Sequence, residues 1–273
     1  MNERLQSSET SKAGRRRLRG WPRSVLLVSS LLLLTGAATL GIPQTGTKAL
    51  ADPYSRGVLL LTQQKWKEAA AEFQQAIRSN PNSSQAYASL GVALTRLGNP
   101  KDAETAFEQA VRLDAKNAQA HYYLGLIAAE SQRLPDATRE LKAAVELKPD
   151  FEPARLALAL ALEESGQIKE AIEEYQTVLK LNPKSADAHN GLGNAYVQNN
   201  EIAAGIEEYR KAVGLKPDFF RAYNNLGSTL ASVGKFDEGY AAIRKALALR
   251  PASFEAHLNM GVILRAKGDP KGR

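Results

Sequence analysis

Cysteine is absent from this 273-residue chain, and histidine, methionine and tryptophan are rare, with three, two and two residues. The lack of cysteine excludes disulfide scaffolds, thiolate metal sites, cysteine nucleophiles and lipid attachment at an N-terminal cysteine. So few histidines leave little material for acid–base catalysis or for a metal centre. We therefore expect a protein that is not an enzyme and that holds neither a cofactor nor a metal ion.

Net positive charge is concentrated at one end of the chain. The formal net charge is +7, yet the segment 1–51 alone carries eight Lys or Arg and only two Asp or Glu. The rest of the chain is therefore almost neutral. Binding to nucleic acid requires a concentrated basic surface on the folded part of a protein. We therefore expect no nucleic-acid partner.

The segment 1–51 has the organisation of a targeting sequence. Residues 1–24 are polar and basic, residues 25–40 are uncharged and rich in leucine, and residues 49–51 read Ala-Leu-Ala. These are the three regions of a secretory signal peptide with its small-residue cleavage site. An uncleaved membrane anchor is the alternative, and a buried core helix is a third interpretation. Whether the segment is a signal peptide or an anchor, its basic end stays in the cytoplasm. We therefore expect residues 52–273 on the other side of the membrane, in the periplasm or a lumen, either exported or tethered to the membrane.

The remainder of the chain repeats itself with a constant period of about 34 residues. Glycine recurs at Gly57, Gly91, Gly125, Gly193, Gly227 and Gly261, and proline recurs at Pro81, Pro149, Pro183, Pro217 and Pro251. A small residue followed four positions later by a large apolar one, such as Ala69 and Phe73, repeats on the same period. Chance does not produce such agreement, so each period is one structural unit.

Each period contains two apolar stripes at helical spacing. Tyr87, Leu90 and Leu94 form one stripe, and Phe107 and Ala110 belong to the next. Alternation with the period of a β-strand does not occur in the sequence. We therefore predict an all-α fold of antiparallel helix pairs, with six full repeats and one half-repeat. The predicted repeats lie near residues 50–83, 84–117, 118–151, 152–185, 186–219 and 220–253, and the half-repeat lies near 254–267.

The breaks within the repeats carry residues that end helices. Gly98, Gly166 and Gly234 stand between the two stripes of their repeats. Glycine takes the left-handed conformation that terminates a helix without a steric penalty. Pro100 suits the first turn of the helix that follows. We therefore predict left-handed backbone at these three glycines.

The runs Tyr-Ala-Ser-Leu-Gly at 87–91 and Tyr-Asn-Asn-Leu-Gly at 223–227 resemble the tetratricopeptide repeat (TPR). The resemblance covers residues 52–267 and implies a right-handed superhelical solenoid with a concave groove. It also implies a non-catalytic scaffold that binds a peptide segment of a protein partner. The family includes photosystem and pilus assembly factors, so an assembly factor for a membrane or envelope complex is the alternative function. A repeat domain accessory to a glycosyltransferase is less favoured.

In proteins of this family, one stripe of residues on the first helix of each repeat lines the groove. Here it is apolar in the early repeats and polar later, and the candidate partner-binding residues are Tyr54, Val58, Tyr122, Leu126, Asp187, Asn190, Asn194, Arg221, Asn224 and Ser228. Asparagine amides both donate and accept hydrogen bonds, so they suit the backbone of an extended peptide. The alternative is that neighbouring helices cover the apolar members.

Two further features lie on the repeat grid. His121, His189 and His257 occupy the slot of an aromatic packing residue in every second repeat, which sets them too far apart for a shared metal ion. The half-repeat carries more apolar residues than one packing stripe holds, including Ile263. We therefore expect some apolar surface to remain open at this end. A slightly frayed cap is one interpretation, and self-association or partner docking, with Ile263 accessible, is the other.

Overall fold

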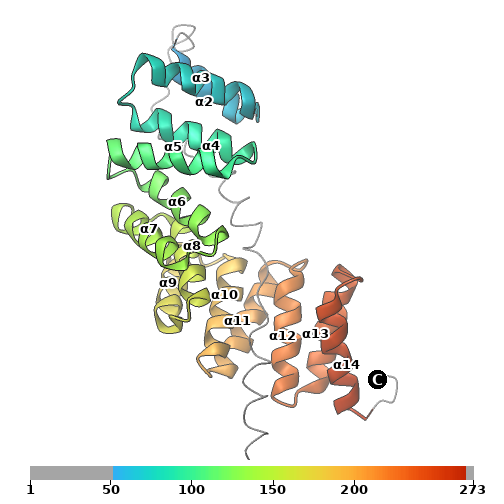
Figure 1. Ribbon diagram of the computed structural model, residues 1–273. Helices are drawn as coiled ribbons and strands as arrows, with labels where there is room; N and C mark the ends of the chain where they lie inside the picture. The colour runs from blue at the N-terminus through green and yellow to red at the C-terminus, as the bar shows by residue number, and fades with distance from the viewer. Residues whose placement is uncertain (1–51, 269–273) are drawn as a thin grey trace, which may run out of the picture. The chain divides into compact units, whose positions relative to one another are not determined.

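The computed structural model describes residues 52–268, and the predictions for the targeting segment 1–51 lie outside the described residues. The chain divides into the units 1–44 and 45–273, and all described residues belong to the second. These residues form thirteen α-helices and no strand (Figure 1), which confirms the all-α prediction. None of the described helices has the length and apolar character needed to span a membrane.

The helices follow one another in a regular order. They are α2 (Pro53–Thr62), α3 (Trp66–Ser79), α4 (Ser84–Arg96), α5 (Pro100–Leu113), α6 (Ala118–Glu130), α7 (Leu134–Leu147), α8 (Glu152–Glu164), α9 (Ile168–Leu181), α10 (Ala186–Gln198), α11 (Ile202–Leu215), α12 (Phe220–Ser232), α13 (Phe236–Leu249) and α14 (Phe254–Ala266). Each even-numbered helix from α2 to α12 is the first helix of its repeat and packs on the helix that follows it. Successive first helices such as α10 and α12 also touch. The result is a stack of helix pairs in chain order, with α14 as the unpaired last member of the described part (Figure 1).

The glycine series lies where the two helices of a pair approach most closely. A Cβ added to Gly91 would lie 2.7 Å from Cε1 of Phe107, and one added to Gly193 would lie 2.6 Å from Cε1 of Tyr209. Contacts this short are not tolerated in folded proteins, so the small residue and the large one are required together. The spacing of these two sequence series therefore fixes how the helices of each pair pack.

The turn inside every repeat has the same backbone. Left-handed φ angles occur at Gln64, Gly98, Gln132, Gly166, Asn200, Gly234 and Gly268, which hold the same position in successive repeats. The prediction for Gly98, Gly166 and Gly234 is confirmed. The glutamines and the asparagine adopt this conformation as well, although a Cβ raises its cost by about 1–2 kcal/mol.

The last helix differs from the expectation at one residue. Ile263 is fully buried and packs with Phe220, Ile243 and Ala256, so the expectation that Ile263 is accessible is wrong. The physical reason is helical phase, because Ile263 follows Ala256 by seven residues and therefore shares its inward face. The exposed apolar side chains of α14 are Phe254, Leu258 and Val262.

Candidate functional site

Asparagine side chains link three successive first helices. The Nδ2 atom of Asn225 on α12 donates to Oδ1 of Asn190 at 3.2 Å and to Oδ1 of Asn194 at 3.0 Å, both on α10. One repeat later, Nδ2 of Asn259 on α14 donates to Oδ1 of Asn224 on α12 at 3.0 Å. We call these five residues the asparagine ladder. Of the predicted site residues, Asn190 and Asn194 share one partner, Asn225, and Asn224 makes the corresponding bond with Asn259. The sequence alone did not single out Asn225 or Asn259.

The ladder orients the amides of Asn190 and Asn224. Their oxygens accept from the next repeat, whereas their NH2 groups make no hydrogen bond within residues 52–268. Both side chains are buried but not completely covered. Each therefore offers a donor whose direction is fixed by the bond on the other side of the amide.

The polar network continues from the ladder residue Asn194 to Glu163, the next-to-last residue of α8, through a side-chain hydrogen bond. Tyr175 donates its hydroxyl to Oε2 of Glu163 at 2.8 Å, and Gln198 donates Nε2 to Oε1 at 2.7 Å. Glu163 is only 7% exposed, and this burial raises its pKa to about 7 despite the hydrogen bonds that favour the carboxylate. Burial and the nearby carboxyl also raise the pKa of the Tyr175 hydroxyl.

The apolar candidates lie in a different environment. Tyr122 and Leu126 are buried, and the Tyr122 ring packs 5.0 Å from the ring of Phe151. Tyr54 and Val58 are half-buried against the cluster that contains Phe73. This is the packing that the alternative interpretation describes, and the partner-binding role of these four residues stays a prediction.

The other polar candidates surround the ladder without joining it. Arg221 is exposed and Asp187 is half-buried. Ser228 is also half-buried, and its hydroxyl donates to the carbonyl oxygen of Asn225 at 3.1 Å within α12. The polar half of the predicted stripe is therefore more accessible at Arg221 than at the asparagines.

Two of the histidines belong to a repeated polar contact rather than to plain packing. Nδ1 of His121 lies 2.7 Å from Oε2 of Glu140, and Nε2 lies 3.2 Å from the carbonyl oxygen of Ala115 in the preceding repeat. His189 contacts Glu208 and the carbonyl of Pro183 in the same way. Both ring nitrogens of His121 face acceptors, which suits the protonated form of that ring.

Arg155 fills the same slot in the repeat between these two. Its guanidinium donates to the carbonyl of Pro149 at 2.6 Å and to Oε2 of Glu174 at 2.8 Å. We call Arg155, His121 and His189 the clamp residues. The sequence signal is a basic side chain followed 19 residues later by glutamate. The hydrogen bond that His121 makes to the Glu140 carboxylate raises the pKa of His121.

His257 differs because it is exposed, and among the described residues its ring makes a hydrogen-bond contact only with the carbonyl oxygen of Ser253, at 2.9 Å. No group of His, Asp or Glu side chains within residues 52–268 is arranged to hold a metal ion. The three histidines are therefore separate features, two of them joining repeats and one on the surface.

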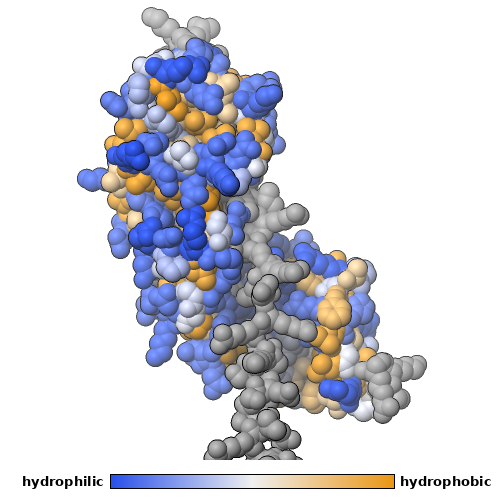
Figure 2. Space-filling model, viewed as in Figure 1, coloured by the Kyte–Doolittle hydropathy of each residue, from blue (hydrophilic) through white to orange (hydrophobic). Residues whose placement is uncertain are grey.

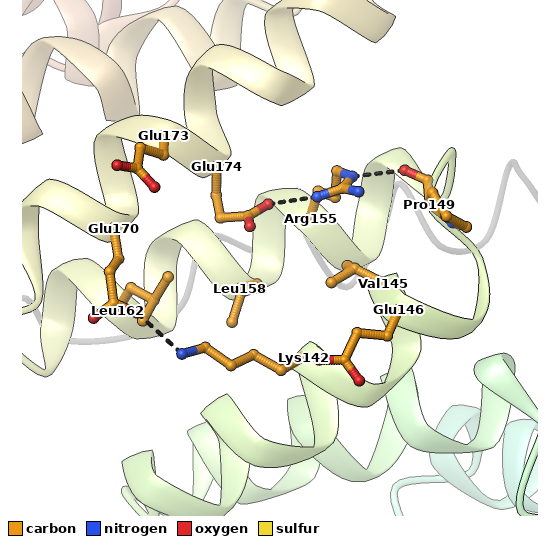
Figure 3. A pocket seen from close by; sticks show the side chains of 10 residues that line it. All are labelled: Lys142, Val145, Glu146, Pro149, Arg155, Leu158, Leu162, Glu170, Glu173 and Glu174. Carbon is orange, nitrogen blue, oxygen red and sulfur yellow. Dashed lines mark hydrogen bonds and ion pairs between the residues drawn. The ribbon is translucent and has the colours of Figure 1, made fainter.

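A surface cleft of about 490 Å³ lies between α7, α8 and α9 (Figure 3). Figure 3 shows Arg155 reaching Glu174 and Lys142 reaching Glu170 across it, at 2.8 and 3.0 Å. Its ten lining residues include no serine, threonine, cysteine or histidine. Four carboxylates line it, and two of them are already paired with cations, so the cleft offers no nucleophile with an adjacent base.

Two family models match the sequence. One is described as the cilia and flagella-associated protein 70 C-terminal domain and matches residues 56–222, and the other is described as the tetratricopeptide repeat and matches residues 220–253. No curated protein matches the sequence.

Solved structures resemble the described fold. YrrB, described as a TPR protein with an unusual peptide-binding site, is 20% identical with a TM-score of 0.62, over 73% of this chain and 99% of that chain. PilF of Pseudomonas aeruginosa is 19% identical with a TM-score of 0.66, over 75% and 93%. PilW, described as a widely conserved type IV pilus biogenesis factor, is 17% identical with a TM-score of 0.63, over 69% and 88%. At these identities the likeness concerns the fold.

Proposed function

The chain belongs to the tetratricopeptide repeat family, and we propose that it is a non-catalytic scaffold that holds a peptide segment of a protein partner along the asparagine ladder. The proposal rests on the orientation of Asn190 and Asn224. Each amide has its oxygen engaged by the next repeat and its NH2 group left to donate. Such donors recognise backbone carbonyl oxygens, which every peptide carries regardless of its side chains.

The spacing of the helices favours one peptide conformation. Packed helices lie about 8–10 Å apart. A polyproline II segment repeats every three residues, with a rise of about 3.1 Å per residue. One turn of such a peptide therefore spans about one step between first helices, and it presents a carbonyl oxygen to each oriented amide in turn. We accordingly expect a preference for extended segments of polyproline II character.

The proposal can be tested by removing the NH2 groups of Asn190 and Asn224 while keeping the side-chain oxygens that accept from Asn225 and Asn259. Asn190→Asp together with Asn224→Asp keeps an oxygen for Asn225 and Asn259 but places a carboxylate where a peptide carbonyl would approach. Each lost hydrogen bond contributes about 0.5–1.5 kcal/mol, so the double variant should bind at least about fivefold more weakly. The control is Asn80→Asp with Asn82→Asp, two exposed loop positions that give the same change in net charge.

The probe is a displayed library of random peptides, selected on the purified chain. We expect selected peptides whose affinity falls in the ladder variant and is unchanged in the control variant, while circular dichroism shows equal helix content. The proposal is overturned if no peptide is enriched, or if enriched peptides bind both variants equally well.

An assembly factor for a membrane or envelope complex is the second candidate. Two observations favour it, namely the apolar stretch at residues 25–40 and the likeness of the fold to PilF and PilW, the second of which is described as a pilus biogenesis factor. We place the repeats on the exported side of a membrane, an inference from residues 1–51 alone. Loss of the gene should then leave the subunits of one membrane complex unassembled, which native gel electrophoresis of membrane fractions detects. A role as a glycosyltransferase accessory has no supporting feature among the described residues.

A further inference from the structure

The last helix carries an uncovered apolar stripe. Phe254, Leu258 and Val262 follow one another at four-residue spacing on α14 and are 76%, 48% and 46% exposed. Figure 2 shows apolar side chains gathered over the C-terminal helices. Large exposed apolar side chains on one stripe mark an interaction surface more often than single ones do.

The repeats show what kind of surface fits this stripe. Leu258 holds the repeat position that Asn224 and Tyr122 hold in earlier repeats, and both of those side chains are buried. The first helix of the next repeat reaches Asn224 through the bond from Asn259 to its Oδ1 atom. On α14 the equivalent face is open within the described residues. It therefore has the shape that receives another α-helix.

The charges beside the stripe identify the helix that fits. Glu255 and Arg265 are exposed on the same face, and neither pairs with another residue among those described. At about 100° per residue these two, the apolar stripe and Ala266 fall within one sector of about 120°. The positions of these six residues are symmetric about residue 260. An antiparallel copy places Leu258 opposite Val262, Glu255 opposite Arg265, and the large Phe254 opposite the small Ala266.

We propose that two copies of this chain associate through α14, antiparallel and related by a two-fold axis near residue 260. Every contact then occurs twice, as in other isologous dimers. A parallel pairing would set Glu255 against Glu255 and Arg265 against Arg265, so the charges select the antiparallel arrangement. Stable interfaces bury about 800 Å² on each partner, and one helix face buries less. We therefore expect a dissociation constant on the order of micromolar for the dimer.

The test reverses the charge at position 255 or at position 265 in the purified full chain. The protein is kept in detergent if its N-terminal segment is retained. Glu255→Arg alone and Arg265→Glu alone each place like charges opposite one another at both ends of the interface. Each variant should dissociate about five- to tenfold more readily in sedimentation equilibrium, since exposed charge pairs contribute modestly. Mixing the two single variants brings opposite charges together at both ends, so the mixture should associate as the wild type does.

Helix α3 provides a matched control. Glu68 in its first turn and Arg78 in its last turn are also exposed and ten residues apart, so Glu68→Arg and Arg78→Glu change the helix ends equally. They should leave the association unchanged, whereas Leu258→Ser should weaken it. The proposal is overturned if the wild type is monomeric at a concentration on the order of 100 µM, well above a micromolar dissociation constant. It is also overturned if neither α14 charge variant weakens association, or if the mixture fails to restore it.

Discussion

Changing Glu163 to glutamine should make the helix stack harder to unfold at alkaline pH than the wild-type protein. Glu163 is buried and accepts hydrogen bonds from Tyr175 and Gln198, and its pKa in the folded state is about 7 instead of the ordinary 4.5. Glutamine has nearly the same shape and keeps one oxygen for Tyr175. The amide of Gln198 can turn to accept from its NH2 group.

The sign follows from where the proton resides. Between pH 4.5 and about 7 the folded protein keeps the proton on Glu163, and the unfolded chain releases it. The unfolded state therefore binds fewer protons, and the free energy of unfolding falls as the pH rises through this window. At about 1.4 kcal/mol per pH unit the loss reaches about 3 kcal/mol above pH 7. Glutamine does not ionise and escapes this loss.

Urea unfolding followed by circular dichroism at pH 5, 6, 7 and 8 measures the effect. Repeat arrays can unfold in segments, so hydrogen exchange in peptides from α8 to α10 should localise it. The two proteins should differ little at pH 5 and most at pH 8. Glu173→Gln, at an exposed position of α9, should behave as the wild type. Parallel pH profiles for wild type and Glu163→Gln would refute the reasoning, as would a variant that is weaker at pH 8.

Three further outcomes are expected. The raised pKa of His121 means that its clamp stabilises the fold fully below pH 6.5 and less as the pH rises through the folded pKa, so His121→Arg should flatten the urea midpoint above pH 6.5. Gln132→Gly should raise the melting temperature, because it relieves about 1 kcal/mol of left-handed strain, and Gly98→Gln should lower it; equal melting temperatures would contradict this. Terminal sequencing of the protein from its native membrane fraction should show cleavage after Ala51, whereas an intact Met1 would indicate an anchor.

The sequence predicted the helix pairs because their cause is local. Gly91 must lie against Phe107, and the equivalent pair of a small and a large residue must meet in the other repeats. The constant period of the sequence therefore shows this requirement many times. The turn at Gly98 was predictable for the same reason. The turn at Gln132 was not, because there the repeat geometry imposes a conformation that the residue itself disfavours.

The site was less predictable because it depends on contacts between repeats. Asn190 and Asn225 are 35 residues apart, and only the offset between successive first helices brings their amides together. Residue type and spacing along one helix do not contain that offset. Ile263 shows a different failure, since its phase relative to Ala256 was available in the sequence and predicts burial.

The asparagine ladder also determines which repeat can be duplicated in tandem without leaving an asparagine of the ladder unpaired. We call each hydrogen bond between asparagines of successive repeats a rung of the ladder. The repeat at 220–253 supplies both an acceptor and a donor, because Asn224 accepts from the following repeat and Asn225 donates to the preceding one. The repeat at 186–219 has the acceptor Asn190 but carries Gly191 in the donor position. A tandem duplication of residues 220–253 would therefore leave every rung paired and lengthen the ladder by one. Gene duplication, or an engineer, could extend the recognition surface one repeat at a time from this unit.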